Sequence, residues 1–262
     1  MNIYHAILLG IVQGLTEFLP ISSSAHLYLT PYFFGWGYQG LGFDVALHWG
    51  TLTAVVAIFG RDYFKYAKAF FKSFKHLKTM DVDMRMSWLL IVGTLPAAAI
   101  GFALRHQAET MFRSPWIIAV TLALFGILLW FADRRVKSIE IHDEVTWKKV
   151  LLVGFAQALA IVPGVSRSGA TITAGLFANL SRQMAVEFSF LLSGPIIFGA
   201  GLASLGELER VDSVLMAGFI ASAVSGFLTI KWLMKYVSTK NFNPFSIYRL
   251  LLAAVIVATL IL

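Results

Sequence analysis

The sequence has no cysteine among its 262 residues, and its charged residues are scarce. Without cysteine the chain forms no disulfide bond and offers no thiolate nucleophile, iron–sulfur ligand or cysteine ligand for zinc. Lys, Arg, Asp and Glu make up 13% of the residues, whereas they make up about a quarter of a soluble domain. The chain has too few charges to cover a water-facing surface, so we interpret it as an integral membrane protein.

Apolar residues, by contrast, make up 58% of the chain and gather in long runs. A helix needs about 17 to 25 apolar residues to cross a bilayer. Six runs reach that length, at roughly residues 43–60, 87–104, 115–132, 184–205, 213–230 and 246–262. The sequence therefore predicts an all-α polytopic membrane protein with six spanning helices.

The net charge of +7 comes from 21 basic and 14 acidic residues. A basic excess can indicate a nucleic-acid partner, but in a membrane chain it more often marks cytoplasmic loops. Most basic residues fall in three connections between spans, at residues 61–85, 134–149 and 231–240. The connection at 205–212 instead carries Glu207, Glu209 and Asp212 with only Arg210. We therefore expect the basic connections inside the cell, both chain ends outside, and no nucleic-acid partner.

A basic and aromatic pattern follows the first span. Basic residues recur at helical spacing with phenylalanines between them, namely Arg61, Lys65, Lys68, Lys72 and Lys75 with Phe64, Phe70, Phe71 and Phe74. An amphipathic helix on the anionic cytoplasmic leaflet accounts for both sets. We expect residues 61–78 to form an amphipathic helix that lies on the membrane surface; a solvated loop is the alternative.

Two further apolar segments, residues 7–29 and 150–180, contain too many polar groups to face lipid. A charged side chain such as Glu17 or Arg167 costs about 3 kcal/mol near the bilayer centre, even on permissive scales. Such groups are therefore expected to face a protein-lined cavity. Pro20 and Pro163 divide the segments, so each is predicted to be a re-entrant hairpin of two half-helices.

The two hairpin segments resemble each other. Matches 144 residues apart join Gly10, Gln13, Leu15, Ser22 and Ser24 to Gly154, Gln157, Leu159, Ser166 and Ser168. Weaker matches 125 residues apart join Gly93, Ala98, Gly101 and Phe102 to Gly218, Ala223, Gly226 and Phe227. We interpret the chain as one membrane domain of two repeats, about 1–133 and about 149–262, joined by a cytoplasmic linker at about 134–148.

Each repeat would hold one broken hairpin and three spans. Because three is odd, the two copies are inserted upside down relative to each other, a plan that many transporters share. The hairpins would then enter from opposite faces and bring their polar tips together near the midplane.

The tips have the residues of an anion site. Serine is a preferred helix N-cap, and the first turn of a helix presents free N–H groups and the positive end of the dipole. Arg167 adds a guanidinium that binds phosphate with two donors and keeps its charge. The alternative is structural: the serines cap the half-helices, and Arg167 neutralises Glu17.

A nucleophile and a proton shuttle would make this site hydrolytic. Ser22, Ser23 or Ser24 could attack phosphorus, and His26 lies one helical turn away. Glu17 could orient His26 or bind a divalent cation, Mg²⁺ or Ca²⁺, together with phosphate oxygens. Charge on the phosphoryl oxygens would be stabilised by Arg167 with the hydroxyls of Ser166, Ser168 and Thr171.

Other polar residues carry less weight. Gln13 and Gln157, in the first half-helices, point either at the tips or at each other. Asp44 and His48 stand near the outer end of the first span, where they line the entrance to the site or simply mark the membrane boundary.

Residues 13–26 and 163–171 resemble the two signature motifs of the undecaprenyl-diphosphate phosphatase family, the bacitracin-resistance membrane phosphatases. The resemblance extends over essentially the whole chain, including residues 187–192. It implies hydrolysis of the C55 isoprenoid diphosphate to the monophosphate and inorganic phosphate. This reaction recycles the lipid carrier for peptidoglycan and other cell-wall polymers.

The resemblance also implies roles by position. The family's acidic motif falls on Gln13 and Glu17, its Ser-His pair on Ser22 or Ser23 with His26, and its phosphate-binding motif on Ser166, Arg167, Ser168 and Thr171. Position 13 is often glutamate in the family, so glutamine here leaves Glu17 as the main acidic metal ligand.

We therefore expect a phosphatase of the bacterial cytoplasmic membrane whose midplane site opens to the external side. A homodimer is a further expectation. The main alternative is a secondary transporter or flippase of a prenyl phosphate, because inverted repeats and broken helices also make transporters. A purely structural scaffold would leave Glu17 and Arg167 unexplained.

Overall fold

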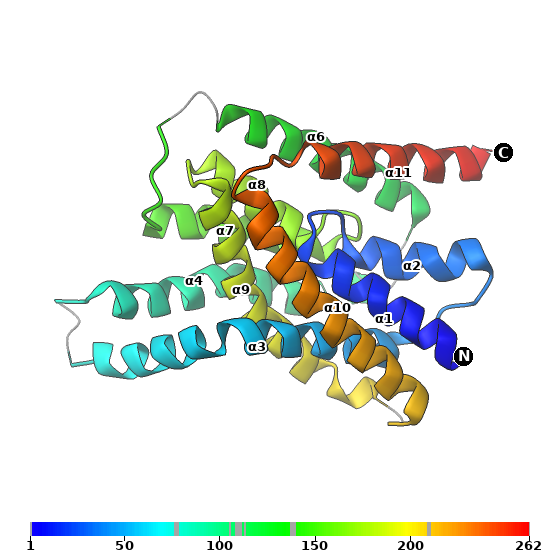
Figure 1. The fold of residues 1–262 in the computed structure, drawn as a ribbon, viewed down its shortest axis with the longest axis horizontal. Helices are drawn as coiled ribbons and strands as arrows, with labels where there is room; N and C mark the ends of the chain where they lie inside the picture. Colours follow the sequence, from blue (N-terminus) through cyan, green and yellow to red (C-terminus); the bar gives the residue numbers. More distant parts are fainter. Residues whose placement is uncertain are drawn as a thin grey trace.

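The structure is a computed structural model that describes residues 2–75, 79–104, 106–107, 112, 114–136, 140–208 and 211–261. Lys78, Lys137, Glu209 and Arg210 lie outside the described residues. The described part is helical and contains no strand (Figure 1). Its elements are α1 (Ile3–Phe18), α2 (Ser23–Phe34), α3 (Leu41–Ser73), α4 (Val82–Ala103), α6 (Pro115–Arg135), α7 (Trp147–Ala158), the 3₁₀ turn η1 (Leu159–Ile161), α8 (Arg167–Phe177), α9 (Arg182–Ala203), the 3₁₀ turn η2 (Leu205–Glu207), α10 (Ser213–Val237) and α11 (Asn243–Ile261).

Among these elements, six helices are long and apolar enough to cross a membrane, namely α3, α4, α6, α9, α10 and α11. They correspond one to one to the six spans that the apolar runs predict. The prediction of an all-α multi-pass membrane protein is thereby confirmed.

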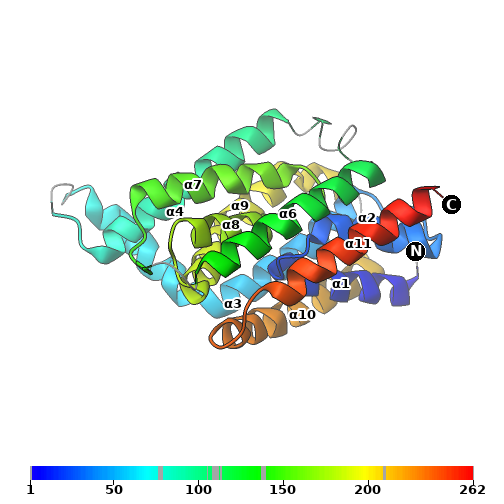
Figure 2. The same ribbon diagram turned by 90° about the horizontal axis from the view of Figure 1, so that it is seen from above.

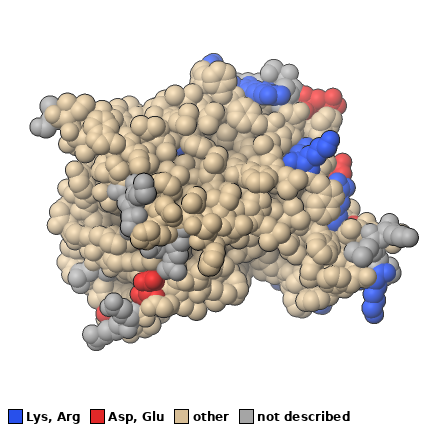
Figure 3. All heavy atoms as spheres, turned by 180° about the vertical axis from the view of Figure 1, so that it is seen from behind, with Lys and Arg blue, Asp and Glu red and all other residues tan. Residues whose placement is uncertain are grey.

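The charges divide the molecule along its length. The N- and C-termini lie at one end, and the connection from α3 to α4 lies at the other (Figure 1). Lys and Arg side chains gather at the latter end, and the middle of the same face carries almost no charge (Figure 3). This distribution suits a bilayer around the middle of the molecule.

Residues 61–73 are helical, as the pattern of basic residues and phenylalanines predicts, but they belong to the first spanning helix, and a position on the membrane surface stays a prediction. Residues up to Ser73 continue α3 without a break, and this helix of 33 residues is about 50 Å long at 1.5 Å per residue. The reason is a partner that the local pattern does not show: α4 runs beside this half of α3. Lys65 Nζ lies 3.1 Å from an Asp83 oxygen, and the rings of Phe70 and Trp88 lie 4.9 Å apart.

Two pairs of short helices, α1 with α2 and α7 with α8, are each interrupted by a break. α1 and α2 are separated by a break at residues 19–22, and α7 and α8 by a break at residues 159–166 that includes η1. Pro20 and Pro163 lie in the breaks, as predicted. The α1–α2 pair opens toward the end that carries the termini, and α7 starts from the opposite end (Figures 1 and 2). The arrangement is compatible with two re-entrant hairpins, whose insertion into a membrane stays a prediction.

The helices pack as the predicted repeat requires, because the first half-helix of each pair crosses a helix of the other half of the chain. α1 packs closely on α10, where a Cβ added to Gly10 would lie 2.3 Å from the Gly218 carbonyl oxygen. α7 packs on α4, where a Cβ added to Gly154 would lie 2.8 Å from the Gly93 carbonyl oxygen. These contacts join matching residues of the two copies. They support the duplication, while the repeat boundaries stay a prediction.

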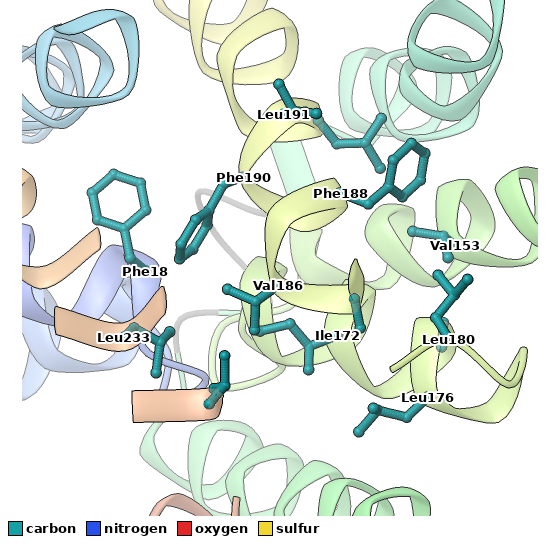
Figure 4. Close-up of a cluster of buried hydrophobic side chains, with 14 of the residues drawn as sticks. Phe18, Val153, Ile172, Leu176, Leu180, Val186, Phe188, Phe190, Leu191 and Leu233 are labelled. Atoms are coloured by element: carbon teal, nitrogen blue, oxygen red, sulfur yellow. The ribbon is translucent and has the colours of Figure 1, made fainter. Parts of the chain in front are cut away.

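The main hydrophobic core lies beside both breaks (Figure 4). Phe18, the last residue of α1, meets Phe190 of α9 edge to face, with ring centroids 5.4 Å apart. Ile172 of α8 and Val153 of α7 belong to the same cluster. The ends of both broken helices are therefore fixed in packed surroundings, as a pre-organised site needs.

Candidate active site

The first break ends in a strained serine. Ser22 has a φ of 77°, a backbone conformation that residues other than glycine rarely adopt. It is the N-cap of α2: its hydroxyl accepts hydrogen bonds from the backbone N–H of Ala25 at 3.4 Å and of Gly164 at 3.2 Å. The second of these bonds crosses to the other break.

The second break repeats this geometry. Ser166 has a φ of 71° and is the N-cap of α8, where its hydroxyl accepts from the Gly169 N–H at 3.0 Å. Ser22 pairs with the Ser24 hydroxyl and Ser166 with the Ser168 hydroxyl, both at 3.2 Å. The predicted match of the two motifs thus has a structural counterpart in the same backbone turn.

The two breaks are joined directly. The Ser168 hydroxyl donates to the Leu19 carbonyl at 2.9 Å. Arg249 of α11 is fully buried and donates to the carbonyls of Pro20 at 3.0 Å, Gly164 at 2.8 Å and Val165 at 3.0 Å. The start of α2 and the start of α8 therefore lie in one rigid unit.

Glu17 is the centre of this unit and is 6% exposed. One carboxylate oxygen accepts from Arg167 Nη2 at 2.9 Å. The other accepts from the Ser23 hydroxyl at 2.6 Å and from Gln13 Nε2 at 3.1 Å. His48 Nε2 lies 3.6 Å from the same oxygen. A carboxylate, a hydroxyl and a guanidinium from the helix ends beside the two breaks thus meet at one point.

Arg167 is held in place from its other side. Its Nη1 donates to the Ser189 carbonyl of α9 at 3.0 Å. The Ser189 hydroxyl in turn pairs with the Thr171 hydroxyl at 2.6 Å. The guanidinium is therefore fixed before any ligand arrives.

A cavity of about 350 Å³ opens at this point. Its polar end is lined by Glu17, Ser23, Ser166 and Arg167. Its walls are largely apolar and come from four helices, with Leu27, Val45, Ile118, Ile196 and Ile197 among them. A cavity that combines a fixed guanidinium with largely apolar walls fits a ligand with an anionic head and a hydrocarbon chain.

The cavity receives only some of the predicted site residues. Ser22, Ser168, Thr171 and Gln13 are buried beside it. The bonds given above occupy the three hydroxyls and Gln13 Nε2, whereas Gln13 Oε1 has no hydrogen-bond partner among the described residues. Ser24 lines the cavity, as Ser23 does.

His26 is oriented differently from what its spacing suggests. Its Nδ1 lies 2.7 Å from the Ser22 carbonyl oxygen, and its Nε2 lies 2.6 Å from the Tyr248 hydroxyl of α11. Among the described residues, the Ser23 hydroxyl bonds to Glu17 and not to His26. Proton exchange between His26 and a serine stays a prediction.

Two residues gain importance from the structure. His48, whose position allowed two interpretations, faces the cavity beside Glu17. Arg249 was not singled out, although an arginine inside an apolar run is itself a signal of a polar partner in the protein interior. Counting the basic residues in the connections between spans misses Arg249, because this residue lies about one turn into the last span.

The described residues contain no group of three or more His, Asp or Glu side chains that could hold a metal ion. Mg²⁺ usually binds through one or two carboxylates and completes its shell with substrate phosphates and water. Glu17, with Asp44 lining the same cavity, supplies that number of carboxylates. The donor set therefore fits a cation that a phosphate ligand shares, and does not fit a site built by protein alone.

The fold and this cavity define a polytopic helical membrane protein with a cavity whose lining suits an amphiphilic anion. A sequence model of the family described as "Bacitracin resistance protein BacA" matches residues 6–255. The chain belongs to that family.

Curated relatives agree over the full length. The chain is 50% identical to a protein of Moorella thermoacetica named undecaprenyl-diphosphatase, over 98% of both chains. It is 45% identical to the undecaprenyl-diphosphatase of Pelotomaculum thermopropionicum, over 98% of this chain and 97% of that one. It is also 45% identical to undecaprenyl-diphosphatase 1 of Pseudoalteromonas translucida, over all of both chains.

Proposed function

We propose that this protein hydrolyses undecaprenyl diphosphate to undecaprenyl phosphate and inorganic phosphate. The observation that carries the proposal is the Ser23–Glu17–Arg167 group in a cavity whose walls are largely apolar. The names of the full-length relatives support the same activity. The reaction returns the lipid carrier to peptidoglycan and other cell-wall synthesis, which accounts for resistance to bacitracin.

The geometry gives each group a role. The N-termini of α2 and α8 converge on the cavity, and the backbone N–H groups of Ser23, Ser24, Arg167 and Ser168 make no hydrogen bond in the described structure. Such free donors at helix starts bind phosphate oxygens, and Arg167 adds a fixed positive charge beside them. The terminal phosphate would lie here with its hydrocarbon chain along the apolar walls.

Ser23 is the hydroxyl placed to attack. Its oxygen would form a bond to the terminal phosphorus while its proton passes to the Glu17 carboxylate, which already accepts it in a hydrogen bond of 2.6 Å. The bond from that phosphorus to the bridging oxygen breaks, and undecaprenyl phosphate leaves with the electron pair. Water then attacks the phosphoserine, releases inorganic phosphate and restores the Ser23 hydroxyl.

We propose that a divalent cation, Mg²⁺ or Ca²⁺, takes part in the reaction. Glu17 would hold it together with the diphosphate oxygens, and it would neutralise phosphate charge. The neighbouring Arg167 shares that carboxylate, so both cations would face the same phosphate.

We further propose that the site opens to the external side of a bacterial cytoplasmic membrane. The cavity lining includes Tyr38, from the connection between α2 and α3, and Ser204, at the end of α9. These segments lie toward the end of the molecule that carries the chain termini (Figure 1). The basic residues lie at the other end (Figure 3), which would be cytoplasmic.

The test is phosphate release by the purified protein in detergent, where no transmembrane gradient exists. The expected result is cation-dependent release of inorganic phosphate from undecaprenyl diphosphate. Arg167→Ala should lower kcat by at least about 10²-fold, as loss of one transition-state donor does. Arg61→Ala, an exposed arginine of α3, is the matched control and should match the wild type.

Absence of turnover in detergent would contradict the proposal. Lipid binding without turnover would favour the transporter or flippase, which needs the anion site but no nucleophile.

A further inference from the structure

The first break is connected to the last helix by a short chain of hydrogen bonds. A carbonyl oxygen only accepts, so the contact of 2.7 Å between His26 Nδ1 and the Ser22 carbonyl requires a proton on Nδ1. In the neutral ring Nε2 then accepts, and the Tyr248 hydroxyl is its donor at 2.6 Å. The two rings also stack, with centroids 5.6 Å apart and ring planes 11° from parallel.

This chain ends on the strained residue that precedes the proposed nucleophile. Ser22, at a φ of 77°, directly precedes Ser23. The neighbour of Tyr248 on α11, Arg249, holds the Pro20 carbonyl at 3.0 Å. Consecutive residues of α11 therefore fix carbonyls on both sides of the turn, one directly and one through His26.

The direction of the His26 side chain supports a role on the backbone. The residues of α2 that line the cavity are Ser23, Ser24, Leu27 and Tyr28, which share one face of the helix. His26 is absent from that lining, and both of its ring nitrogens are already engaged.

We propose that Tyr248 is a positioning residue for the phosphatase reaction. Its hydroxyl fixes the His26 ring, whose Nδ1–H holds the Ser22 carbonyl and thereby keeps the Ser23 hydroxyl on Glu17. His26 then acts on the backbone of the break rather than as the acid or base. This inference rests on the proposed function for its kinetic consequence, but the hydrogen-bond chain itself does not.

The kinetic test uses changes that separate a hydrogen bond from proton transfer. Tyr248→Phe removes only the hydroxyl and should lower kcat about fivefold to tenfold, the rate equivalent of one neutral hydrogen bond, with KM changed less than twofold. Tyr4→Phe makes the same change on an exposed tyrosine of α1 and should match the wild type.

His26→Asn keeps an N–H donor near the Nδ1 position but cannot exchange protons as imidazole does. We expect it to stay within about tenfold of the wild-type kcat, whereas His26→Ala, which leaves the turn free to shift, should lose about a hundredfold. In the His26→Asn background, Tyr248→Phe should have no further effect, because its partner is gone.

The proposal is overturned if Tyr248→Phe matches the wild type, or if its loss multiplies in full with that of His26→Asn. It is also overturned if His26→Asn is as inactive as His26→Ala, which would establish proton transfer. The thermal midpoint and the monodispersity of each purified variant are measured and compared with those of the wild type, so that a misfolded variant is recognised.

A second readout does not depend on turnover. Imidazole ¹⁵N NMR of the protein in detergent, with His26 assigned by its loss in His26→Asn, should show the tautomer that carries its proton on Nδ1. Tyr248→Phe should shift the Nε2 resonance. A spectrum that shows His26 protonated on Nε2 would contradict the chain of hydrogen bonds. A wild-type protein that releases no phosphate but has the expected spectrum would contradict only the proposed function.

Discussion

Arg249 provides a quantitative test of how the two breaks are held together. Its guanidinium is fully buried and, among the described residues, forms no ion pair with a carboxylate. It is the hydrogen-bond donor to the carbonyls of Pro20, Gly164 and Val165 at 2.8–3.0 Å. Replacing Arg249 by methionine keeps much of the volume and removes every donor.

The magnitude follows from those three acceptors. A buried acceptor left without a partner costs about 1–3 kcal/mol, so three of them cost roughly 3–9 kcal/mol. Removing a buried charge recovers part of this cost, because its desolvation is no longer required. We therefore expect a net loss of about 3 kcal/mol in the free energy of unfolding.

The assay is thermal unfolding in detergent alongside phosphate release. For a chain of this size, about 3 kcal/mol corresponds to a fall of roughly 6–12 °C in Tm. Phosphate release should fall even below the Tm, because no guanidinium then joins the Pro20 carbonyl of the first break to the Gly164 carbonyl of the second. Arg61→Met, on an exposed face of α3, is the matched control and should leave both quantities unchanged. An Arg249→Met protein with wild-type Tm and wild-type turnover would refute this reasoning.

Three further changes have defined outcomes. Gly14→Ala would place a Cβ 2.0 Å from the Ser225 hydroxyl oxygen and should destabilise the protein by about 1–3 kcal/mol. Gly101→Ala, with open space around it, should be neutral or stabilise the protein by up to about 1 kcal/mol. A thermal-shift comparison that ranks the two variants the other way would contradict this packing. Asp133→Ala removes the acceptor of the Arg182 side chain and should lower the free energy of unfolding by about 3–5 kcal/mol in the same thermal assay. A loss below about 1 kcal/mol would show that the Asp133–Arg182 pair does not stabilise the fold. Glu17→Gln removes the acceptor of the Ser23 proton and should lower kcat by about 10²–10⁴-fold, so that a variant within tenfold of wild type would exclude Glu17 as the base.

The sequence predicted the spans well because each depends on a local property, a long apolar run that only a bilayer or a large core can accommodate. The two breaks were also predictable, since a proline beside several hydroxyls interrupts an otherwise apolar helix. The cost of leaving a charge in lipid predicted that Glu17 and Arg167 face a protein-lined cavity, and the inverted repeat predicted that the two tips meet. The direct Glu17–Arg167 pair was the structural alternative in that prediction.

The rest depends on contacts between distant residues. The Tyr248–His26 bond joins residues 222 positions apart, and no local spacing encodes it. The spacing of His26 from Ser23 indicated proximity but not direction, and its ring turns to α11. The continuation of α3 past Gly60 depends on α4, which supplies Asp83 as a partner for the helix end. The cation, the homodimer and the roles of the site residues stay predictions.

The central claim is that Ser23, held by Glu17 beside Arg167, is the group that attacks phosphorus. The most direct measurement compares phosphate release from undecaprenyl diphosphate by Ser23→Ala and Ser24→Ala, two neighbouring serines that both line the cavity. The account predicts that Ser23→Ala loses at least about 10³-fold in kcat while Ser24→Ala stays within tenfold of wild type. Near-wild-type turnover by Ser23→Ala, or a reversed order of the two variants, would contradict it.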